Sequence, residues 1–168
     1  AELGGLQRSG AIELHFDQGL SSEDIALFME DVEFRVSQVS QFLGGDPQPV
    51  RVWLYRSDAQ KKRLVGAGDT QFSKPWRHEV HVNALGWPHP VIKHELVHAL
   101  AARWGQGPFG VTSRWLGLYP NAGVIEGLAV AADNPVDELT LHEWAAAMKR
   151  QHWLPDVSVL MEPSGFYA

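Results

Sequence analysis

The chain of 168 residues contains no cysteine. This absence excludes a disulfide framework and thiolate metal sites, so any metal must be held by His, Asp or Glu side chains. No apolar run approaches the length of a membrane-spanning helix, and the first residues do not read as a signal peptide. A net charge of −6 leaves no excess of Lys and Arg, which argues against a nucleic-acid partner.

The residues that are present have the composition of a globular domain. Hydrophobic residues make up 45% of the chain and charged residues 20%, which suffices for one domain with a buried core. We therefore expect residues 1–168 to form a single domain. The chain begins at Ala1 and stops at "MEPSGFYA" without a closing element, so we also expect it to be part of a longer polypeptide with further domains.

Hydrophobic periodicity predicts an α+β fold, with a small sheet followed by a helical portion. Three segments alternate apolar and polar residues as strands do, and the other patterned segments have the period of helices. Ser21 with Asp24, and Thr140 with Glu143, resemble capping boxes, and Asn121 can cap a further helix. The predicted strands are 11–17, 49–55 and 77–85, and the predicted helices are 21–45, 89–105, 122–133 and 140–151, with a short helix or turn at 57–66.

Residues 93–98 read "KHELVH" and lie within a predicted helix. His94 and His98 are four residues apart, so both lie on one helix face and can converge on one ion. Glu95 lies about 100° around the helix, where its carboxylate can reach a water on that ion. This is the H-E-x-x-H arrangement of two zinc ligands and a general base.

A simpler interpretation of "KHELVH" is a set of hydrogen-bonded histidines at a helix surface. The pattern arises by chance in about 2% of chains of this composition. Its neighbours Leu96 and Val97 are apolar, however, and polar groups on a helix in such surroundings are costly to bury without partners. A metal ion would supply that partner.

A catalytic zinc takes a third protein ligand, and Glu126 is the residue that the sequence favours. A third histidine would be expected at position 104 with Gly at 101, but these positions hold Trp104 and Ala101. Glu126 instead lies in "VIEGLAVAAD", where apolar neighbours leave a carboxylate in need of a counter-charge. Asp133, two turns later, can accept the second N–H of a ligand histidine. Both acids can also be solvated, Glu126 in the first turn of its helix and Asp133 at the end.

Together, "HELVH" and "EGLAVAAD" resemble the motifs of the gluzincin zinc metallopeptidases, most similar to the bacterial peptidase MA-like families. The resemblance covers residues 11–133 and implies a zincin-like fold, in which a small, mostly antiparallel sheet packs on the H-E-x-x-H helix. It also implies a hydrolase that cuts a peptide or protein substrate with Zn²⁺, and it favours a location outside the bacterial cytoplasm or at a membrane. Residues 78–84 stand where such families have the edge strand that pairs with substrate.

Three features depart from the family pattern. Gly123 stands where a Trp precedes the third ligand, and the interval between His98 and Glu126 is longer than in thermolysin-like relatives. The G-x-M-E-N motif of aminopeptidases is absent, so capture of a free N-terminus is unsupported.

The family mechanism also needs a donor that stabilises the tetrahedral intermediate, usually Tyr or His. Tyr119 precedes the Glu126 segment, at a position comparable with a donor tyrosine of thermolysin-like enzymes. Tyr167 and His142 are further candidates. Each can equally be a loop or surface residue without a role in catalysis.

The sequence thus predicts a zinc peptidase in which His94, His98 and Glu126 bind the metal and Glu95 activates water. Two alternatives remain. One is a zinc-binding regulatory or adaptor domain of the same fold without turnover. The other is a metal-free helical domain with a coincidental motif.

Overall fold

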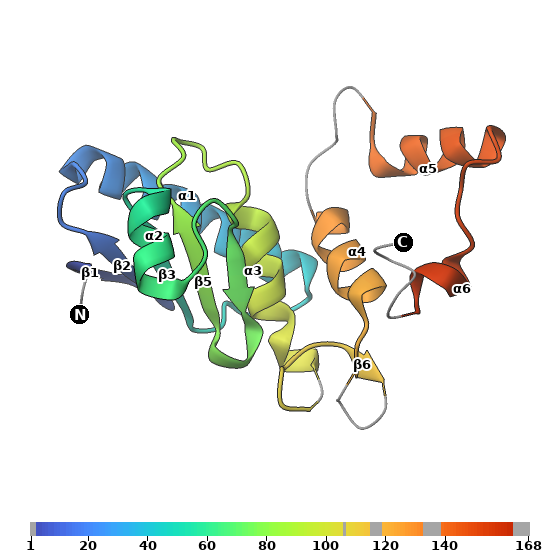
Figure 1. The fold of residues 1–168 in the computed structure, drawn as a ribbon, viewed down its shortest axis with the longest axis horizontal. Helices are drawn as coiled ribbons and strands as arrows, with labels where there is room; N and C mark the ends of the chain where they lie inside the picture. The colour runs from blue at the N-terminus through green and yellow to red at the C-terminus, as the bar shows by residue number, and fades with distance from the viewer. Residues whose placement is uncertain (1–2, 106, 115–118, 133–138, 163–168) are drawn as a thin grey trace.

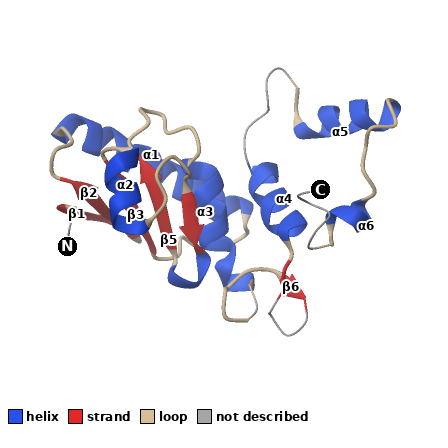
Figure 2. Cartoon of the chain, viewed as in Figure 1, coloured by secondary structure: helices blue, strands red, loops and turns tan. Residues whose placement is uncertain are grey.

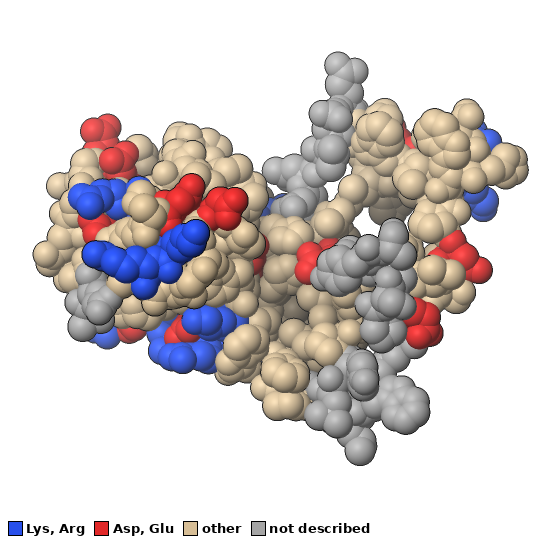
Figure 3. Space-filling model, viewed as in Figure 1, with Lys and Arg blue, Asp and Glu red and all other residues tan. Residues whose placement is uncertain are grey.

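The computed structural model describes residues 3–105, 107–114, 119–132 and 139–162. It is an α+β structure, as predicted: a five-stranded sheet with helices on both faces, followed by a portion that is mainly helical (Figures 1 and 2). No helix among these residues is both long and apolar enough to cross a membrane. On the face seen in Figure 3, acidic side chains are interspersed with Lys and Arg over the sheet.

The sheet is mixed, so the prediction of a mostly antiparallel sheet was wrong. Its strand order is β1-β2-β3-β5-β4, with β2, β3 and β5 mutually parallel and the two outer strands antiparallel to their neighbours. The β2–β3 pair is parallel because α1 returns the chain to the starting end of the sheet. The β3–β5 pair is parallel because β4, which runs antiparallel to both, returns the chain before β5 begins. The strands are β1 Gly4–Ser9, β2 Ile12–Asp17, β3 Val50–Tyr55, β4 Phe72–Lys74 and β5 Glu79–Asn83.

All three predicted strands are present, but two outer strands were missed. β1 reads "GGLQRS" and β4 reads "FSK", and neither segment shows the alternation that identifies a strand. The omission of β4 led to a second error. Residues 78–84 were predicted to form the edge strand of the sheet, and this was wrong. They lie inside the sheet because β4 pairs with β5, and β4 is the edge strand on that side.

The predicted helices are also present. Ser21 Oγ accepts a hydrogen bond from the Asp24 amide, and Thr140 and Glu143 form the predicted capping box. Asn121 Oδ1 accepts a hydrogen bond from Val124 N at 3.3 Å, as expected for a cap. The helices are α1 Ser22–Phe42, α2 Asp58–Val65, α3 Ile92–Leu100, α4 Ala122–Ala132, α5 Leu141–Arg150 and α6 Val157–Leu160. Shorter elements are the 3₁₀ turns η1 Pro75–Arg77 and η2 Ala101–Trp104, and the strand pair β6 Ser113–Arg114 and β7 Tyr119–Pro120.

The core lies between one face of the sheet and the helices α1 and α3. Alternate sheet residues such as Val52, Val80 and Val82 are fully buried there, together with Val32 of α1 and Leu96 of α3. α2 lies on the opposite face of the sheet (Figure 1). The sheet therefore fixes α3, the helix that carries the H-E-x-x-H motif, along its buried side.

The helical portion packs on this core through α4. Ala129 and Ala132 of α4 are buried and belong to the core cluster. At the other end of α4, Gly123 lies so close to α6 that a Cβ there would be 2.4 Å from the Leu160 carbonyl oxygen. No residue of α5 or α6 is buried.

Candidate metal centre

α3 presents His94 and His98 on the face that does not contact the sheet. Leu96, Val97 and Leu100 are buried against the sheet and α1, which leaves the two histidines on the side facing α4. The imidazole rings are perpendicular, with centroids 4.8 Å apart. The side chain of His94 is 23% exposed and that of His98 is 11% exposed, so the rings lie at the wall of a pocket rather than in the core.

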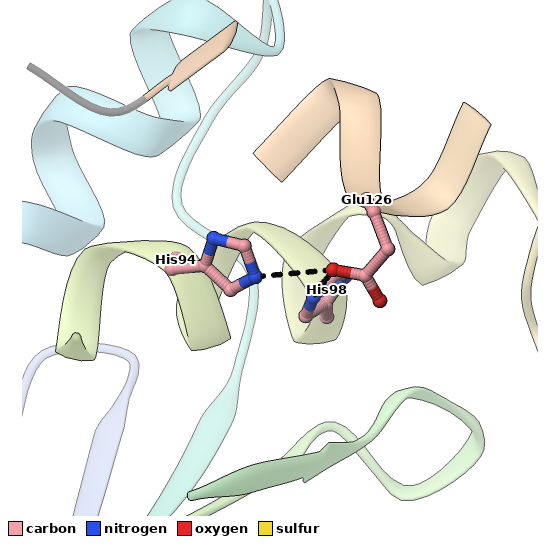
Figure 4. A group of neighbouring side chains, drawn as sticks. All are labelled: His94, His98 and Glu126. Carbon is pink, nitrogen blue, oxygen red and sulfur yellow. Dashed lines mark hydrogen bonds and ion pairs between the residues drawn. The ribbon is translucent and has the colours of Figure 1, made fainter. Parts of the chain in front are cut away.

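Glu126 of α4 reaches both histidines. Its Oε2 lies 3.3 Å from His94 Nε2 and 3.5 Å from His98 Nε2 (Figure 4). One ligand atom from each of the three residues lies within 4.8 Å of the others, which makes them a group that could hold a metal ion. The contact between α3 and α4 thus brings together residues from two motifs far apart in the sequence.

Two separations within this group are those of a tetrahedral zinc site. Ligand atoms about 2.0–2.1 Å from a tetrahedral zinc lie about 3.3–3.4 Å from one another. The two His–Glu distances of 3.3 and 3.5 Å are of that size, and the donors are two imidazole nitrogens and a carboxylate oxygen. A metal-binding experiment distinguishes such a site from a carboxylate that bridges two histidines by hydrogen bonding.

Burial favours the neutral, ligating form of His98. Desolvation lowers the pKa of this imidazole, while the nearby charges of Glu126 and Glu95 act in the opposite direction. A histidine must be deprotonated to bind a metal, and a lowered pKa makes that form available at neutral pH.

Glu95 lies on the sheet side of the same pocket and is only 8% exposed. Its Oε2 lies 2.5 Å from the hydroxyl of Ser73, which donates to it, and the Glu95 carbonyl oxygen is 2.9 Å from the same hydroxyl. Ser73 is the middle residue of β4, so the edge strand fixes the orientation of this carboxylate. Sequence reasoning missed Ser73 because β4 itself was not predicted.

A buried lysine holds the start of β4 in place. Lys61 of α2 is fully buried, and its ammonium donates to the Thr70 carbonyl at 2.7 Å and to Gln71 Oε1 at 3.1 Å. Burial lowers the Lys61 pKa, and the charges of Glu95, Asp58 and Asp69 oppose that shift. Lys61 thus binds the two residues that precede β4, the strand that carries Ser73. Nothing in "SDAQKKRLVG" distinguishes Lys61 from its neighbours in the sequence.

The candidate ligands and Glu95 line one pocket of about 370 Å³. It lies between β4 and η1 on one side and α3 and α4 on the other. Its lining consists of Gln71, Phe72, Ser73, Pro75, His94, Glu95, His98, Ile125 and Glu126. A larger hollow of about 640 Å³ lies at the N-terminal ends of β2 and β3 and shares no residue with this pocket. We place the chemistry in the smaller pocket, because among the described residues it is there that three candidate metal-ligating side chains converge.

The remaining predicted site residues are not brought to the pocket by the described structure. Asp133 and Tyr167 lie outside the described residues. Tyr119 begins β7, just before α4, and its side chain lies outside the described part. His142 is exposed in the first turn of α5 and does not line the pocket. Within the described residues, the lining therefore includes no tyrosine and no histidine besides His94 and His98.

Comparisons with protein-family models, with curated proteins and with solved structures found no match to this chain.

Proposed function

We propose that this protein is a zinc-dependent peptidase of the gluzincin type with a zincin-like fold. His94, His98 and Glu126 would hold the metal, and Glu95 would act as general base. The observation that carries the proposal is the convergence of three ligand atoms within 4.8 Å in a pocket that also contains a buried carboxylate. The sequence pattern H-E-x-x-H supports it independently, because it is short-range and owes nothing to the tertiary contact of α3 with α4.

When bound, zinc lowers the pKa of a coordinated water to about 7 and polarises a carbonyl oxygen. The chain itself supplies the proton transfers. Glu95 would accept a proton from the attacking water and return it to the departing amine. Ser73 would keep the Glu95 carboxylate turned toward the pocket wall in one orientation, because its hydroxyl donates to Oε2. A base held in this way loses less entropy on reaching the reactive geometry.

The edge of β4 supports a peptide as the substrate. β4 is an end strand, so its backbone pairs with β5 on one side only. Residues 71–73 and Pro75 line the pocket that contains the candidate ligands. An extended peptide can add to such an edge as a further strand, and its scissile bond would then lie beside Glu95 and the metal ligands.

Metal analysis of the purified protein tests the ligand set. We expect about one zinc per chain in the wild type, and loss of that zinc in both His94→Ala and Glu126→Ala. Glu30→Ala is a matched control, since Glu30 is an exposed glutamate on α1. A wild-type protein that takes up no zinc would overturn the proposal. Stoichiometric zinc in Glu126→Ala would overturn the third ligand alone.

A zinc-binding domain without turnover is a second candidate, and one observation favours it. The described pocket lining offers no tyrosine or additional histidine to stabilise a tetrahedral intermediate. Such a domain would bind one zinc per chain through the same residues and cleave nothing. A broad peptide library incubated with the zinc-loaded protein separates the two functions, because cleavage that is lost in Glu95→Gln supports only the peptidase.

A further inference from the structure

A row of four aromatic rings crosses the sheet on the face that α2 covers. His15 of β2, Trp53 of β3, His81 of β5 and Phe72 of β4 are consecutive partners in the strand register. The rings are nearly parallel, with centroid separations of 4.1, 5.9 and 4.6 Å along the row. This row is separate from the hydrophobic core, which lies on the other face of the sheet.

A cavity of about 260 Å³ lies against the middle of this row. Its lining consists of Leu3, Trp53, Tyr55, Leu64, Val65, Lys74, Arg77, Glu79 and His81. It shares no residue with the candidate metal pocket. β4 lies between the two, with Phe72 and Ser73 in the wall of the metal pocket and Lys74 in the wall of this cavity.

Two ring nitrogens in the cavity wall lack a hydrogen-bond partner among the described residues. They are Trp53 Nε1 and His81 Nε2, and the second of these lies 3.5 Å from Glu79 Oε2. His81 is 3% exposed, and its Nδ1 lies 2.8 Å from the Tyr55 hydroxyl, which has no other acceptor in the described structure. Tyr55 therefore donates to Nδ1, and the proton of the neutral imidazole is on Nε2. Both groups are thus N–H donors. Glu79 Oε2 is the carboxylate oxygen that faces His81 Nε2, so Trp53 Nε1 is the donor left without an acceptor among the described residues, which is rare for a buried donor.

The charges around the cavity favour an anion. The Glu79 carboxylate is already paired, with Arg77 Nε at 3.1 Å and an Arg51 guanidinium nitrogen at 3.3 Å. Lys74 has no carboxylate partner among the described residues, and its ammonium lies 5.5 Å from the centre of the Phe72 ring. Burial lowers the pKa of His81 to about 3, and the cations Lys74, Lys61 and Arg77 add to the effect. His81 is therefore neutral, and Lys74 is the cation of the described wall that is left to pair with a ligand.

We propose that this cavity is a second binding site, which takes a small organic carboxylate. A carboxylate oxygen would accept a hydrogen bond from Trp53 Nε1, and the carboxylate would pair with Lys74. The apolar body of the ligand would rest against Leu64 and Val65 of α2. The site goes beyond the proposed peptidase function and does not depend on it, because the two pockets have no lining residue in common.

Titration of the full chain with sodium benzoate, followed in ¹H–¹⁵N spectra, tests the proposal. The indole N–H signal of Trp53 is identified by its loss in Trp53→Phe. We expect this signal to shift downfield and saturate with a Kd of about 1 mM or below, which corresponds to about 4 kcal/mol. Lys74→Met should weaken binding at least about tenfold, since it removes the only unpaired cation in the wall. Lys62→Met, an exposed lysine on α2, is the matched control and should bind as the wild type does.

Two further probes need no variant. Benzamide has the same body without the charge, and acetate has the charge without the body. Both should bind at least about tenfold more weakly than benzoate. The proposal is overturned if the Trp53 signal does not saturate with benzoate, if benzamide binds equally well, or if acetate does. Equal benzoate binding by wild type and Lys74→Met also overturns it, and would leave Trp53 Nε1 as a site for ordered water only.

Discussion

The part of the molecule built around the sheet and the helical portion after it differ sharply in burial. Among the residues that the structure describes, 3–105 contribute all of the buried hydrophobic side chains except two alanines of α4, Ala129 and Ala132. In residues 119–162, α5 and α6 bury none. Helices gain most of their stability from packing an apolar face, so the sheet-containing part carries the stability of the fold. The helical portion contributes little to that stability, but it supplies one of the three candidate ligands.

The candidate metal centre spans this boundary. His94, Glu95 and His98 lie on a helix that is buried along one side, while Glu126 lies on α4 and keeps 32% of its side-chain exposure. A bound metal would therefore join the two parts by bonds that neither could form alone. The difference between the parts predicts how each will respond to substitution.

The largest effect is expected from the same Glu→Gln change on either side of the boundary. Glu95→Gln should keep about one zinc per chain and reduce peptide cleavage about 10²- to 10⁴-fold, the range attributed to a positioned general base. Glu126→Gln should lose the zinc, because a neutral amide is not among the usual zinc ligands. Zinc content and cleavage rate are measured on the same samples. Loss of zinc in Glu95→Gln would contradict the separation of roles.

Truncating one leucine in each part tests where stability resides. Leu14 is fully buried in β2, and Leu14→Ala should lower the free energy of unfolding by about 2–5 kcal/mol. Leu154 is 45% exposed, and Leu154→Ala should change the free energy of unfolding by no more than about 0.5 kcal/mol. Urea unfolding monitored by circular dichroism gives both values. Similar losses in the two variants would show that the helical portion is packed as tightly as the sheet.

Ser73 tests whether the edge strand positions the base. Ser73→Ala should lower kcat about tenfold while KM and zinc content stay unchanged, because one hydrogen bond to a charged group is lost. Ser73→Thr keeps a hydroxyl at this position and should restore most of the rate. If Ser73→Ala and Ser73→Thr are both as active as the wild type, the contact with Glu95 has no part in catalysis.

The smallest effects are expected from two glycines of α4, for which the structure predicts opposite signs. A Cβ at Gly127 would meet nothing within 4 Å, so Gly127→Ala should stabilise the protein by about 0.5–1 kcal/mol through helix propensity. A Cβ at Gly123 would collide with the Leu160 carbonyl oxygen, so Gly123→Ala should destabilise it by about 1 kcal/mol or more. Thermal unfolding measures both. Stabilisation by both changes would mean that α6 is not held against α4.

Local patterns predicted most of the elements, and the errors fell on segments without a pattern. The strands β2, β3 and β5 alternate apolar and polar residues because one face of each packs on α1 or α3. β4 has three residues, too few for alternation to be seen, and β1 is an outer strand that begins with two glycines and is mostly exposed. The sheet was expected to be mostly antiparallel from a family resemblance, but α1 and β4 return the chain so that three strands are parallel.

The sequence by itself determined the types of candidate ligand and the spacing of two of them. His94 and His98 share a helix face because the α-helix repeats every 3.6 residues, a local property that needs no fold. Only the tertiary structure decided that Glu126 meets them, that Ser73 binds Glu95 and that β4 forms the wall of the pocket. It alone also stacked His15, Trp53, His81 and Phe72 into one row. These contacts join residues far apart in the chain, and they depend on strand register and helix packing, which local periodicity does not encode.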